Sequence, residues 1–297
     1  MPVGRIEYVE GRGELFFRDS GPETDIRGTV LLLHGWMVTA DLNWAISYGP
    51  LIADGYRVVA LDHRGHGRGL RSTQAFTLKD AADDAAALLR HLDTGPAIVA
   101  GYSMGGAIAQ LIARDHPELV KAVVLCATAL QWRYPRWVRF AWKLMSLLQF
   151  ILRVFPSQVY AWMTEGVAIQ NPALAHWVAA ELHRGDAQQI AEAGRELSKF
   201  DSRRWIGSIG RPLSVVLTTE DHLVPPRSQL EIASYARDTK VFQLPADHVS
   251  AFAAPSMFTS VLLEAIHSAE ERSSAVAAAV GEVVSLPRQS FPVERRA

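Results

Sequence analysis

Short, almost uninterrupted runs of hydrophobic residues recur along the chain and alternate with stretches whose apolar residues have helical spacing. The runs are rich in β-branched residues and lack apolar–polar alternation, which is typical of strands buried on both faces of a parallel sheet. Segments such as residues 78–92 and 105–115 have the pattern of amphipathic helices. This order predicts an α/β fold with a doubly wound, mostly parallel sheet. The runs are Thr29 to Leu33, Arg57 to Leu61, Ala97 to Ala100, Lys121 to Cys126, Leu213 to Leu217 and Lys240 to Leu244.

The strand pattern stops between about residues 130 and 209, where the sequence is helical in pattern and holds six of the eight tryptophans. A helical insertion between two sheet strands is typical of a lid over the carboxyl ends of the strands, where α/β sheets bind ligands. We therefore expect a lid at residues 131–209, with its first helix beginning near Pro135. The remainder, residues 1–130 and 210–267, forms the predicted core.

Both ends of the chain are less clearly patterned. The run Glu14 to Arg18 predicts an additional, antiparallel edge strand. Residues 268–297 lack a firm period, and Pro287 and Pro292 oppose a helix that continues to the end. We expect a frayed or disordered tail there.

Composition and charge exclude several classes of protein. Of the 297 residues, 49% are hydrophobic and 21% are charged, which are ordinary values for a globular protein. The formal net charge of -1 gives no field that would attract nucleic acid, so we expect no nucleic-acid partner. The single cysteine, Cys126, excludes an intramolecular disulfide and reads as a buried, inert thiol. The first residues lack the apolar stretch of a signal peptide, and the longest apolar run, Leu144 to Leu152, is too short to span a membrane. A cytoplasmic location is the expectation.

Residues Gly101 to Gly105 match the nucleophile-elbow pattern G-x-S-x-G, with Ser103 at its centre. A predicted strand precedes the motif and a predicted helix follows it, which is the context that the pattern requires. The sharp turn forces an unusual backbone at the serine, and the flanking glycines relieve the crowding. A Gly-rich turn with an incidental serine is the alternative interpretation, and the strand–turn–helix context disfavours it.

A serine hydroxyl becomes a useful nucleophile only when a base accepts its proton. In folds that carry this elbow, an acid and a histidine follow on loops after later strands. The loop after Leu217 offers Glu220, Asp221 and His222, and the loop after Leu244 offers Asp247 and His248. Both kinds of side chain thus occur at the topologically expected places.

The sequence resembles the α/β-hydrolase superfamily, and in particular its esterases, monoacylglycerol lipases and cofactor-free haloperoxidases. The resemblance covers roughly residues 18–266 and implies that Asp221, three residues after Thr218, is the acid and His248 the general base. Glu220 and Asp247 are the competing carboxylates. Here Thr218 replaces the usual glycine, and Asp247 replaces the glycine that usually precedes the histidine.

The resemblance extends to the segment Leu33-His34-Gly35-Trp36, which is similar to the family's oxyanion loop. It implies that the backbone N–H groups of Trp36 and Met104 form an oxyanion hole, and that His34 is a structural hydrogen-bonding residue. Charge develops on the substrate oxygen only in the transition state, so such donors must be aimed in advance.

A second family-like segment runs from Asp62 to Gly67, and we interpret it as a structural turn whose charged side chains hold neighbouring loops. His63 and His66 lack accompanying residues at metal-site spacing, and the chain has no phosphate-binding G-x-x-x-x-G-K-[ST] motif. We therefore expect neither a metal nor a cofactor.

The predicted lid is apolar around most of the circumference of its first helix. Packing on the core explains part of this surplus, and contact with a lipophilic substrate or peripheral contact with lipid would explain the rest. The candidate substrate contacts are Trp137, Phe140, Trp142 and Leu148.

The pattern predicts a serine hydrolase that cleaves a carboxylic ester or thioester with a lipophilic part through an acyl-enzyme, acting on a small molecule. C–C bond hydrolysis and cofactor-free perhydrolysis, the source of haloperoxidase activity, use the same three residues and remain open. A protein of this fold that binds ligands without turnover is a further alternative. Epoxide hydrolases and dehalogenases are disfavoured, because those relatives carry aspartate where Ser103 stands. The sequence leaves the oligomeric state open.

Overall fold

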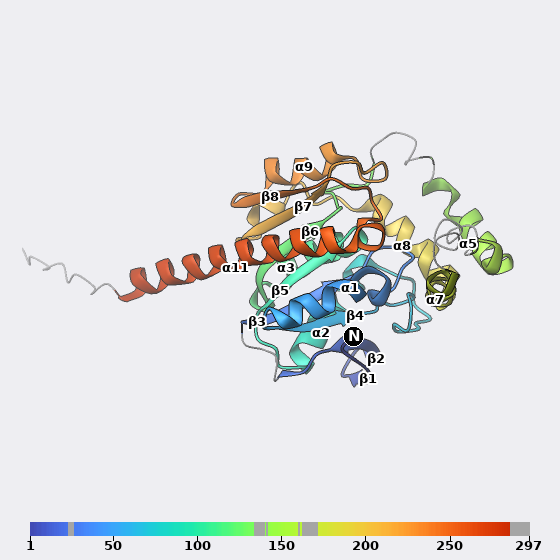
Figure 1. Cartoon of the computed structure of the whole chain (residues 1–297), viewed down its shortest axis with the longest axis horizontal. Helices are drawn as coiled ribbons and strands as arrows, with labels where there is room; N and C mark the ends of the chain where they lie inside the picture. Colours follow the sequence, from blue (N-terminus) through green and yellow to red (C-terminus); the bar gives the residue numbers. More distant parts are fainter. Residues whose placement is uncertain (23–26, 134–139, 141, 160, 162–171, 286–297) are drawn as a thin grey trace, which may run out of the picture.

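The computed structural model describes the chain except for residues 23–26, 134–139, 141, 160, 162–171 and 286–297. The side chains of residues 172, 173 and 276–285 are also outside the description. Within the described ranges, eight strands form one sheet in the order β1-β2-β4-β3-β5-β6-β7-β8, which Figure 1 shows edge to edge. The strands are β1 Val3–Val9, β2 Gly13–Asp19, β3 Gly28–Leu33, β4 Tyr56–Leu61, β5 Ala97–Tyr102, β6 Val120–Cys126, β7 Leu213–Thr218 and β8 Thr239–Leu244.

The sheet is parallel from β4 to β8, and its central strands are buried almost throughout. This confirms the predicted α/β fold, because uninterrupted apolar runs can be buried only where helices cover both faces of a sheet. All six predicted strands are present. Cys126 is fully buried at the end of β6, as expected.

Helices cover the sheet on two sides. One apolar core joins the sheet to α1, α10 and α11, and the other joins it to α2, α3 and α9. Threonines cap two of these helices: the hydroxyl of Thr39 accepts a hydrogen bond from Leu42 N, and that of Thr77 accepts one from Asp80 N. The helices are α1 Ala40–Ala53, α2 Leu78–His91, α3 Met104–Asp115, α9 Pro226–Tyr235, α10 Ser250–Ala253 and α11 Pro255–Ser285, with 3-10 turns η2 Pro117–Leu119 and η4 Ile206–Ser208.

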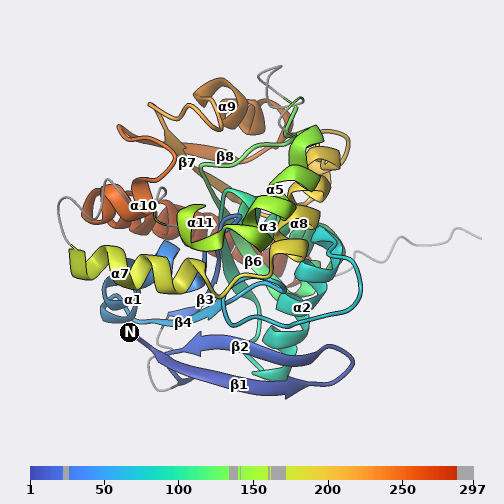
Figure 2. The ribbon, with the colours of Figure 1, turned by 90° about the vertical axis from the view of Figure 1, so that its right-hand side faces the viewer.

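The segment between β6 and β7 includes the helices α5 Met145–Val154, α7 Pro172–Leu182 and α8 Ala187–Lys199, and the 3-10 turn η3 Trp142–Leu144 precedes α5. Figure 2 views the molecule from the end of the sheet that these helices occupy. They contact the loops that follow the strands: Asp186 N donates to Gly65 O after β4, and the Trp36 indole after β3 donates to Ile190 O on α8. The expected start of the first helix at Pro135 lies outside the described residues.

Two expectations about the ends of the chain are wrong. The strand over Glu14 to Arg18 is antiparallel, but it is β2 and pairs with both β1 and β4, so the edge strand is β1. The second error is the disordered tail: residues 268–285 continue α11, which extends beyond the body of the molecule in Figure 1. Residues 286–297 lie outside the described part of the chain.

Distant contacts explain why α11 continues. Ala269 is fully buried against the sheet, and Glu270 accepts hydrogen bonds from Tyr56 and Lys121. Arg272 donates to the backbone oxygens of Leu213 and Asp238. These partners lie far away in sequence, so the local pattern after Ser268 gave no sign of them.

Candidate active site

Ser103 sits at the turn between β5 and α3 with a backbone that few non-glycine residues adopt. Its φ is 54° and its ψ is -114°, outside the regions that side chains ordinarily favour. Glycines make this turn possible: a Cβ at Gly101 would lie 2.2 Å from Gly105 O, and one at Gly105 would lie 2.1 Å from Leu33 O. The crowding explains why the turn requires small residues on both sides of the serine.

The structure brings three of the sequence-predicted side chains into one hydrogen-bonded row. Ser103 Oγ lies 3.0 Å from His248 Nε2, and His248 Nδ1 lies 2.7 Å from Asp221 Oδ2. Ser103 follows β5, and the loops after β7 and β8 carry Asp221 and His248, so all three residues follow the carboxyl ends of parallel strands. The Asp221 carboxylate is fully buried, whereas the His248 ring keeps 16% exposure.

The two competing carboxylates lie elsewhere. Glu220 and Asp247 are exposed, and Asp247 Oδ1 accepts a hydrogen bond from the backbone N–H of Val249. Of the three carboxylates considered, Asp221 is the one that the structure places against the histidine ring.

The Asp221 carboxylate is held by a network that sequence reasoning missed. Its Oδ1 accepts hydrogen bonds from Leu223 N and Val224 N at 2.9 and 2.7 Å. Its Oδ2 accepts from Thr218 Oγ1 at 2.9 Å, and Gln229 Nε2 lies 3.3 Å away. The Gln229 side chain is fully buried and also joins Thr218 Oγ1, so it fixes the position of the acid. Gln229 lies eight residues after Asp221, on α9, and this contact forms only in the folded chain.

Tyr102 supports the histidine from the other side. Its hydroxyl donates to His248 O at 2.6 Å, and its ring meets the imidazole edge to face, with the centroids 5.9 Å apart. Burial raises the pKa of Tyr102 well above its usual value, so this phenol stays neutral and acts as a hydrogen-bond donor. The histidine is therefore positioned both at its backbone and at its ring.

The predicted oxyanion loop lies beside the serine. A Cβ on Gly35 would be 3.4 Å from Ser103 Cβ, and Gly35 N donates to Asn43 Oδ1 at 2.7 Å. Met104 is the first residue of α3, where backbone N–H groups have no acceptor within the helix. The adjacent Trp36 is tied to α8 by its indole N–H, 2.7 Å from Ile190 O.

His34 packs beneath this loop as a neutral hydrogen-bonding residue. Its Nε2 accepts from His63 N at 2.9 Å, which leaves Nδ1 to donate to Gly35 O at 2.7 Å. Burial, reinforced by the neighbouring His63 and His66, lowers the pKa of His34 well below its usual value. Burial also lowers the pKa of His63 to about 3 and that of His66 to about 4. Among the described residues, no group of three or more His, Cys, Asp or Glu side chains is arranged to hold a metal ion.

The charged side chains of the turn from Asp62 to Gly67 hold neighbouring elements of the core. Asp62 accepts hydrogen bonds from Ala40 N and Arg68 N, and Arg64 binds Asp84 on α2 through two nitrogens. Burial raises the pKa of Asp62 to about 6, although these N–H groups act in the opposite direction.

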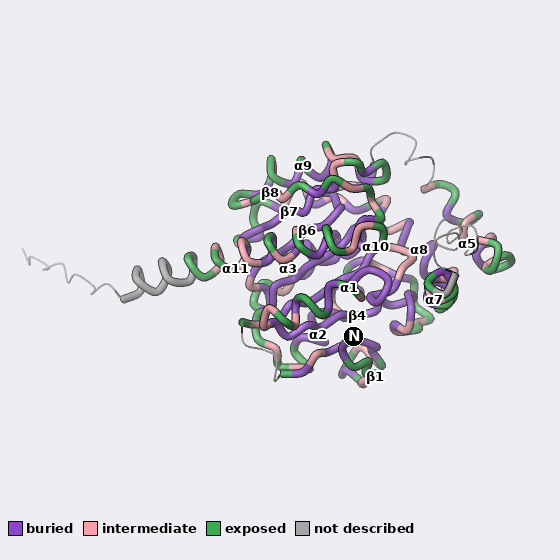
Figure 3. The backbone as a smooth tube through the Cα atoms, viewed as in Figure 1, coloured by how far each residue is buried: buried purple, intermediate pink, exposed green. Residues whose placement is uncertain are grey.

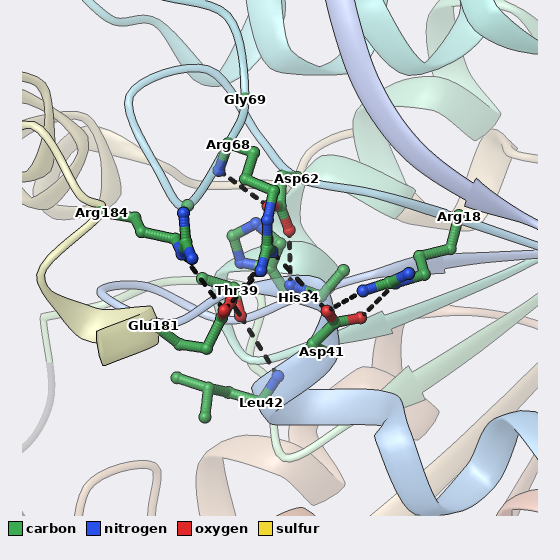
Figure 4. Close-up of polar contacts among 12 residues, drawn as sticks. Arg18, His34, Thr39, Asp41, Leu42, Asp62, Arg68, Gly69, Glu181 and Arg184 are labelled. Atoms are coloured by element: carbon green, nitrogen blue, oxygen red, sulfur yellow. Dashed lines mark hydrogen bonds and ion pairs between the residues drawn. The ribbon is translucent and has the colours of Figure 1, made fainter. Parts of the chain in front are cut away.

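An ion-pair cluster next to this turn, the Glu181 cluster, consists of Asp41, Asp62, Arg68 and Glu181 (Figure 4). Arg68 Nη1 lies 2.9 Å from Glu181 Oε2 and 3.6 Å from Asp41 Oδ2. Arg18 adds two hydrogen bonds to Asp41. The three carboxylates are almost completely buried, and Glu181 belongs to α7. The cluster thus ties a helix of the β6–β7 segment to the core.

The four candidate substrate contacts are not equivalent. Leu148 packs against an apolar cluster formed by Leu42, Leu152, Val178, Leu182 and Ile190, to which Trp36 and Phe252 also belong. Trp142 is partly buried, with its ring 5.6 Å from that of Trp36 and its indole N–H donating to Trp132 O. Phe140 is 65% exposed. Trp137 lies outside the described residues.

Comparisons with known proteins agree with this architecture. The sequence profile described as "alpha/beta hydrolase fold" matches residues 28–159. The chain is 28% identical to the non-heme chloroperoxidase of Streptomyces lividans over 241 residues, which cover 75% of this chain and 84% of that protein. It is 25% identical to 3-oxoadipate enol-lactonase 2 of Acinetobacter baylyi over 208 residues, covering 69% and 76%.

Among solved structures, the enol-lactonase of Burkholderia xenovorans superposes with a TM-score of 0.76 at 21% identity, covering 89% of this chain and all of that one. The chain has the α/β-hydrolase fold and is similar to members of that superfamily. Its relatives are enzymes that act on small molecules. None of the described helices has the length and apolar character needed to cross a membrane.

Proposed function

We propose that this α/β-hydrolase is a serine esterase that cleaves carboxylic esters with a lipophilic part through an acyl-enzyme. The observation that carries the proposal is the hydrogen-bonded row of Ser103, His248 and Asp221. It supplies a nucleophile, a base within 3.0 Å of it and a carboxylate within 2.7 Å of the other ring nitrogen. The enol-lactonase relative acts, by its name, on a lactone, which is a cyclic ester.

The proposed reaction follows from the tautomer of the histidine. Asp221 Oδ2 accepts the hydrogen on His248 Nδ1, so Nε2 keeps its lone pair for the Ser103 proton. Ser103 Oγ forms a bond to the ester carbonyl carbon as its proton moves to Nε2, and His248 then returns that proton to the departing alcohol. Water, activated in the same way, attacks the acyl-enzyme and releases the acid and Ser103.

The oxyanion of each tetrahedral intermediate would be held by the backbone N–H groups of Met104 and Trp36. The dipole of α3 favours negative charge at its N-terminus, where Met104 lies. Because the Trp36 indole is bonded to Ile190 on α8, the helical segment would hold one of the two donors in place. This arrangement couples the position of the segment to the site of the developing charge.

The preference for a lipophilic substrate is supported by the apolar cluster beside the row. It reaches the proposed site through Trp36 on the oxyanion loop and through Phe252, four residues after His248. Leu148 on α5 packs against the same cluster, which makes it the strongest of our four candidate contacts. An acyl chain lying there would be removed from water, with a gain of roughly 0.8 kcal/mol per buried methylene.

A fluorophosphonate probe tests the proposal directly, because it phosphonylates only an activated serine. We expect stoichiometric labelling of the wild type, loss of labelling in Ser103→Ala and His248→Ala, and full labelling in Ser208→Ala, whose serine is exposed on η4. Hydrolysis of a p-nitrophenyl ester should follow the same order. An unlabelled wild-type protein with an intact fold would instead indicate a ligand-binding member of the superfamily.

Perhydrolysis is a second candidate, favoured by the similarity to a non-heme chloroperoxidase. In that reaction hydrogen peroxide, rather than water, would attack the acyl-enzyme and release a peracid. The two reactions share the acyl-enzyme, so the ratio of peracid to acid formed with added peroxide distinguishes them.

A further inference from the structure

Helix α5 has two apolar sides, and among the residues that the structure describes only one of these sides is packed against the protein. Met145 and Leu152 are 6% and 3% exposed and lie on the inner side. The outer side carries exposed apolar residues at spacings of three and four, as expected for one face of a helix. Figure 3 shows α5 at the periphery, with exposed positions along it. The exposed apolar residues on α5 and its flanks, which we call the α5 face, are Phe140, Leu144, Leu147, Phe150, Val154 and Phe155.

The stretch of sequence that carries the α5 face has basic residues but no acidic ones. Residues 131–164 contain no aspartate or glutamate, although the chain as a whole carries a net charge of -1. The same stretch contains five basic residues, and Lys143 and Arg153 among them are exposed on η3 and α5. The basic residues are Arg133, Arg136, Arg139, Lys143 and Arg153.

A small hollow of about 260 Å³ lies beside the α5 face, lined by Arg133, Trp142, Lys143 and Ser198. Of the lining residues that the structure describes, Arg133 and Lys143 are cationic, Ser198 carries a hydroxyl and Trp142 an indole. Such a surface suits a phosphate group with apolar chains attached, because the cations and the apolar residues lie next to each other.

Two other surroundings of the α5 face, exposure to water and contact with a second copy of the chain, agree less well with its residues. A contiguous exposed patch of large apolar side chains usually marks an interaction site in proteins that bury the rest of their apolar surface. A symmetric contact between two copies would bring two acid-free, basic segments together, and like charges at an interface are unfavourable. An anionic surface with an apolar interior matches both the charge and the apolar residues.

We propose that the α5 face docks on an anionic lipid bilayer. The outer apolar residues enter the boundary between headgroups and acyl chains, while Lys143 and Arg153 lie at the level of the lipid phosphates. The inner side of the same helix, through Leu148 and Leu152, packs against the apolar cluster that reaches Trp36. Docking would thus place the lipid next to the helical segment that contacts Trp36 on the proposed oxyanion loop. The binding itself does not depend on the reaction.

Co-sedimentation with vesicles tests the proposal in the full-length Ser103→Ala protein, which separates binding from turnover. Vesicles of phosphatidylcholine with 30 mol% phosphatidylglycerol are compared with pure phosphatidylcholine at low and high salt. We expect binding to the anionic vesicles and a loss of at least tenfold in 0.5 M NaCl, since surface charges are screened there. Equal binding to both kinds of vesicle, or no binding to either, would overturn the proposal.

Matched variants locate the contact. Leu147→Ser with Phe150→Ser should lower the partition coefficient at least tenfold, and Lys143→Gln with Arg153→Gln should lower it by about fivefold per charge on anionic vesicles. The control pair, Ile46→Ser with Leu230→Ser, removes comparably exposed apolar side chains from α1 and α9 and should bind as before. Sedimentation velocity without lipid adds a check: a dimer that Phe150→Ser dissociates would assign the face to a second copy and refute the lipid proposal.

Discussion

The row of Ser103, His248 and Asp221 and the helical segment between β6 and β7 are held in place in different ways. In the row, residues of the core hold the carboxylate and the histidine: Thr218 and Gln229 bind Asp221, and Tyr102 binds the His248 backbone. In the helical segment, α8 is buried along one side, whereas α5 leaves one side exposed. The side chains that would perform the chemistry are therefore held by hydrogen bonds, whereas α5 is held mainly by apolar packing.

The buried ion pairs show the same contrast within the helical segment itself. The Glu181 cluster anchors α7 to the core through Arg68, in surroundings from which water is largely excluded. On α5 the described polar side-chain contacts are those of Ser146 and Gln149 with Arg195 on α8, which are partly exposed. Substitutions in the row should therefore affect the rate most, those in the Glu181 cluster the stability, and those on α5 the selection of substrate.

The largest effect is expected on the rate, from a substitution in the row of Ser103, His248 and Asp221. Asp221→Asn should lower kcat by about 10³–10⁴-fold, because an amide cannot hold the imidazole tautomer in which Nε2 accepts a proton. Steady-state hydrolysis of a p-nitrophenyl ester measures the change. Glu220→Gln and Asp247→Asn are the matched controls, and both should retain the wild-type rate. A severe loss in Asp247→Asn with normal activity in Asp221→Asn would reverse the assignment of the acid.

The next largest effect is expected on the free energy of unfolding, from a substitution that removes the anchor of α7. Glu181→Gln should lower the free energy of unfolding by about 2 kcal/mol, because the partly buried Arg68 loses its nearest carboxylate and keeps only the more distant Asp41 and Asp62. Chemical denaturation measures the change. The control is Glu196→Gln on α8, which breaks a pair with exposed Lys199 and should cost less than about 1 kcal/mol. Equal losses in the two variants would mean that α7 is not anchored by this pair.

Asp62 adds a pH dependence to the same cluster. Burial raises its pKa in the folded protein to about 6 from the ordinary value of 3.8. The folded state therefore binds a proton more tightly than the unfolded state, and the stability due to this proton falls as the pH rises from about 4 to 6. The loss should reach up to about 3 kcal/mol for a shift of this size.

Asp62→Asn, which resembles the neutral form, isolates this contribution. Unfolding by urea at pH 4, 5, 6 and 7 should show the variant gaining stability relative to the wild type across the window and remaining constant relative to it above pH 7. A stability difference that does not vary with pH would show that Asp62 titrates alike in both states.

The sequence predicted the row of Ser103, His248 and Asp221 better than it predicted the helical segment between β6 and β7. Uninterrupted apolar runs identify parallel strands, and the sharp turn at Ser103 needs glycine at positions 101 and 105 because a Cβ there would clash with the backbone. These features are local, so a pattern can reveal them. The register from Thr218 likewise placed Asp221 in the loop, although the supporting Gln229 is a contact made only in the folded chain.

The features that the sequence did not predict depend on contacts between residues that are far apart in the chain. Trp142 contacts either the substrate or the core, depending on how its helical turn is rotated relative to Trp36. The sequence pattern of the lid does not determine that rotation. The continuation of α11 depends on Glu270 meeting Tyr56 and Lys121. The edge strand β1 mixes apolar and polar residues, most of which are exposed, so its hydrophobic signal is weak.

The smallest effect concerns the selection of substrate. The value of kcat/KM for p-nitrophenyl esters should rise several-fold per two-carbon extension until the apolar site is full, since each buried methylene is worth about 0.8 kcal/mol. Leu148→Ala should flatten this rise, because Leu148 packs against the apolar cluster beside Trp36. A series of esters from acetate to decanoate measures both slopes.

Phe150→Ala is the control for this series, because it shortens a side chain on the same helix that is 56% exposed and lies on the outer side. In detergent-free solution below the micellar limit of the esters, it should leave the slope unchanged. Melting temperatures separate the two possible causes of a flattened slope: direct contact predicts a change in slope with little change in stability, whereas packing predicts a lower melting temperature with the slope preserved. A slope that falls from acetate onward in the wild type would mean that the apolar cluster serves only to hold α5, and that the substrate is short and polar.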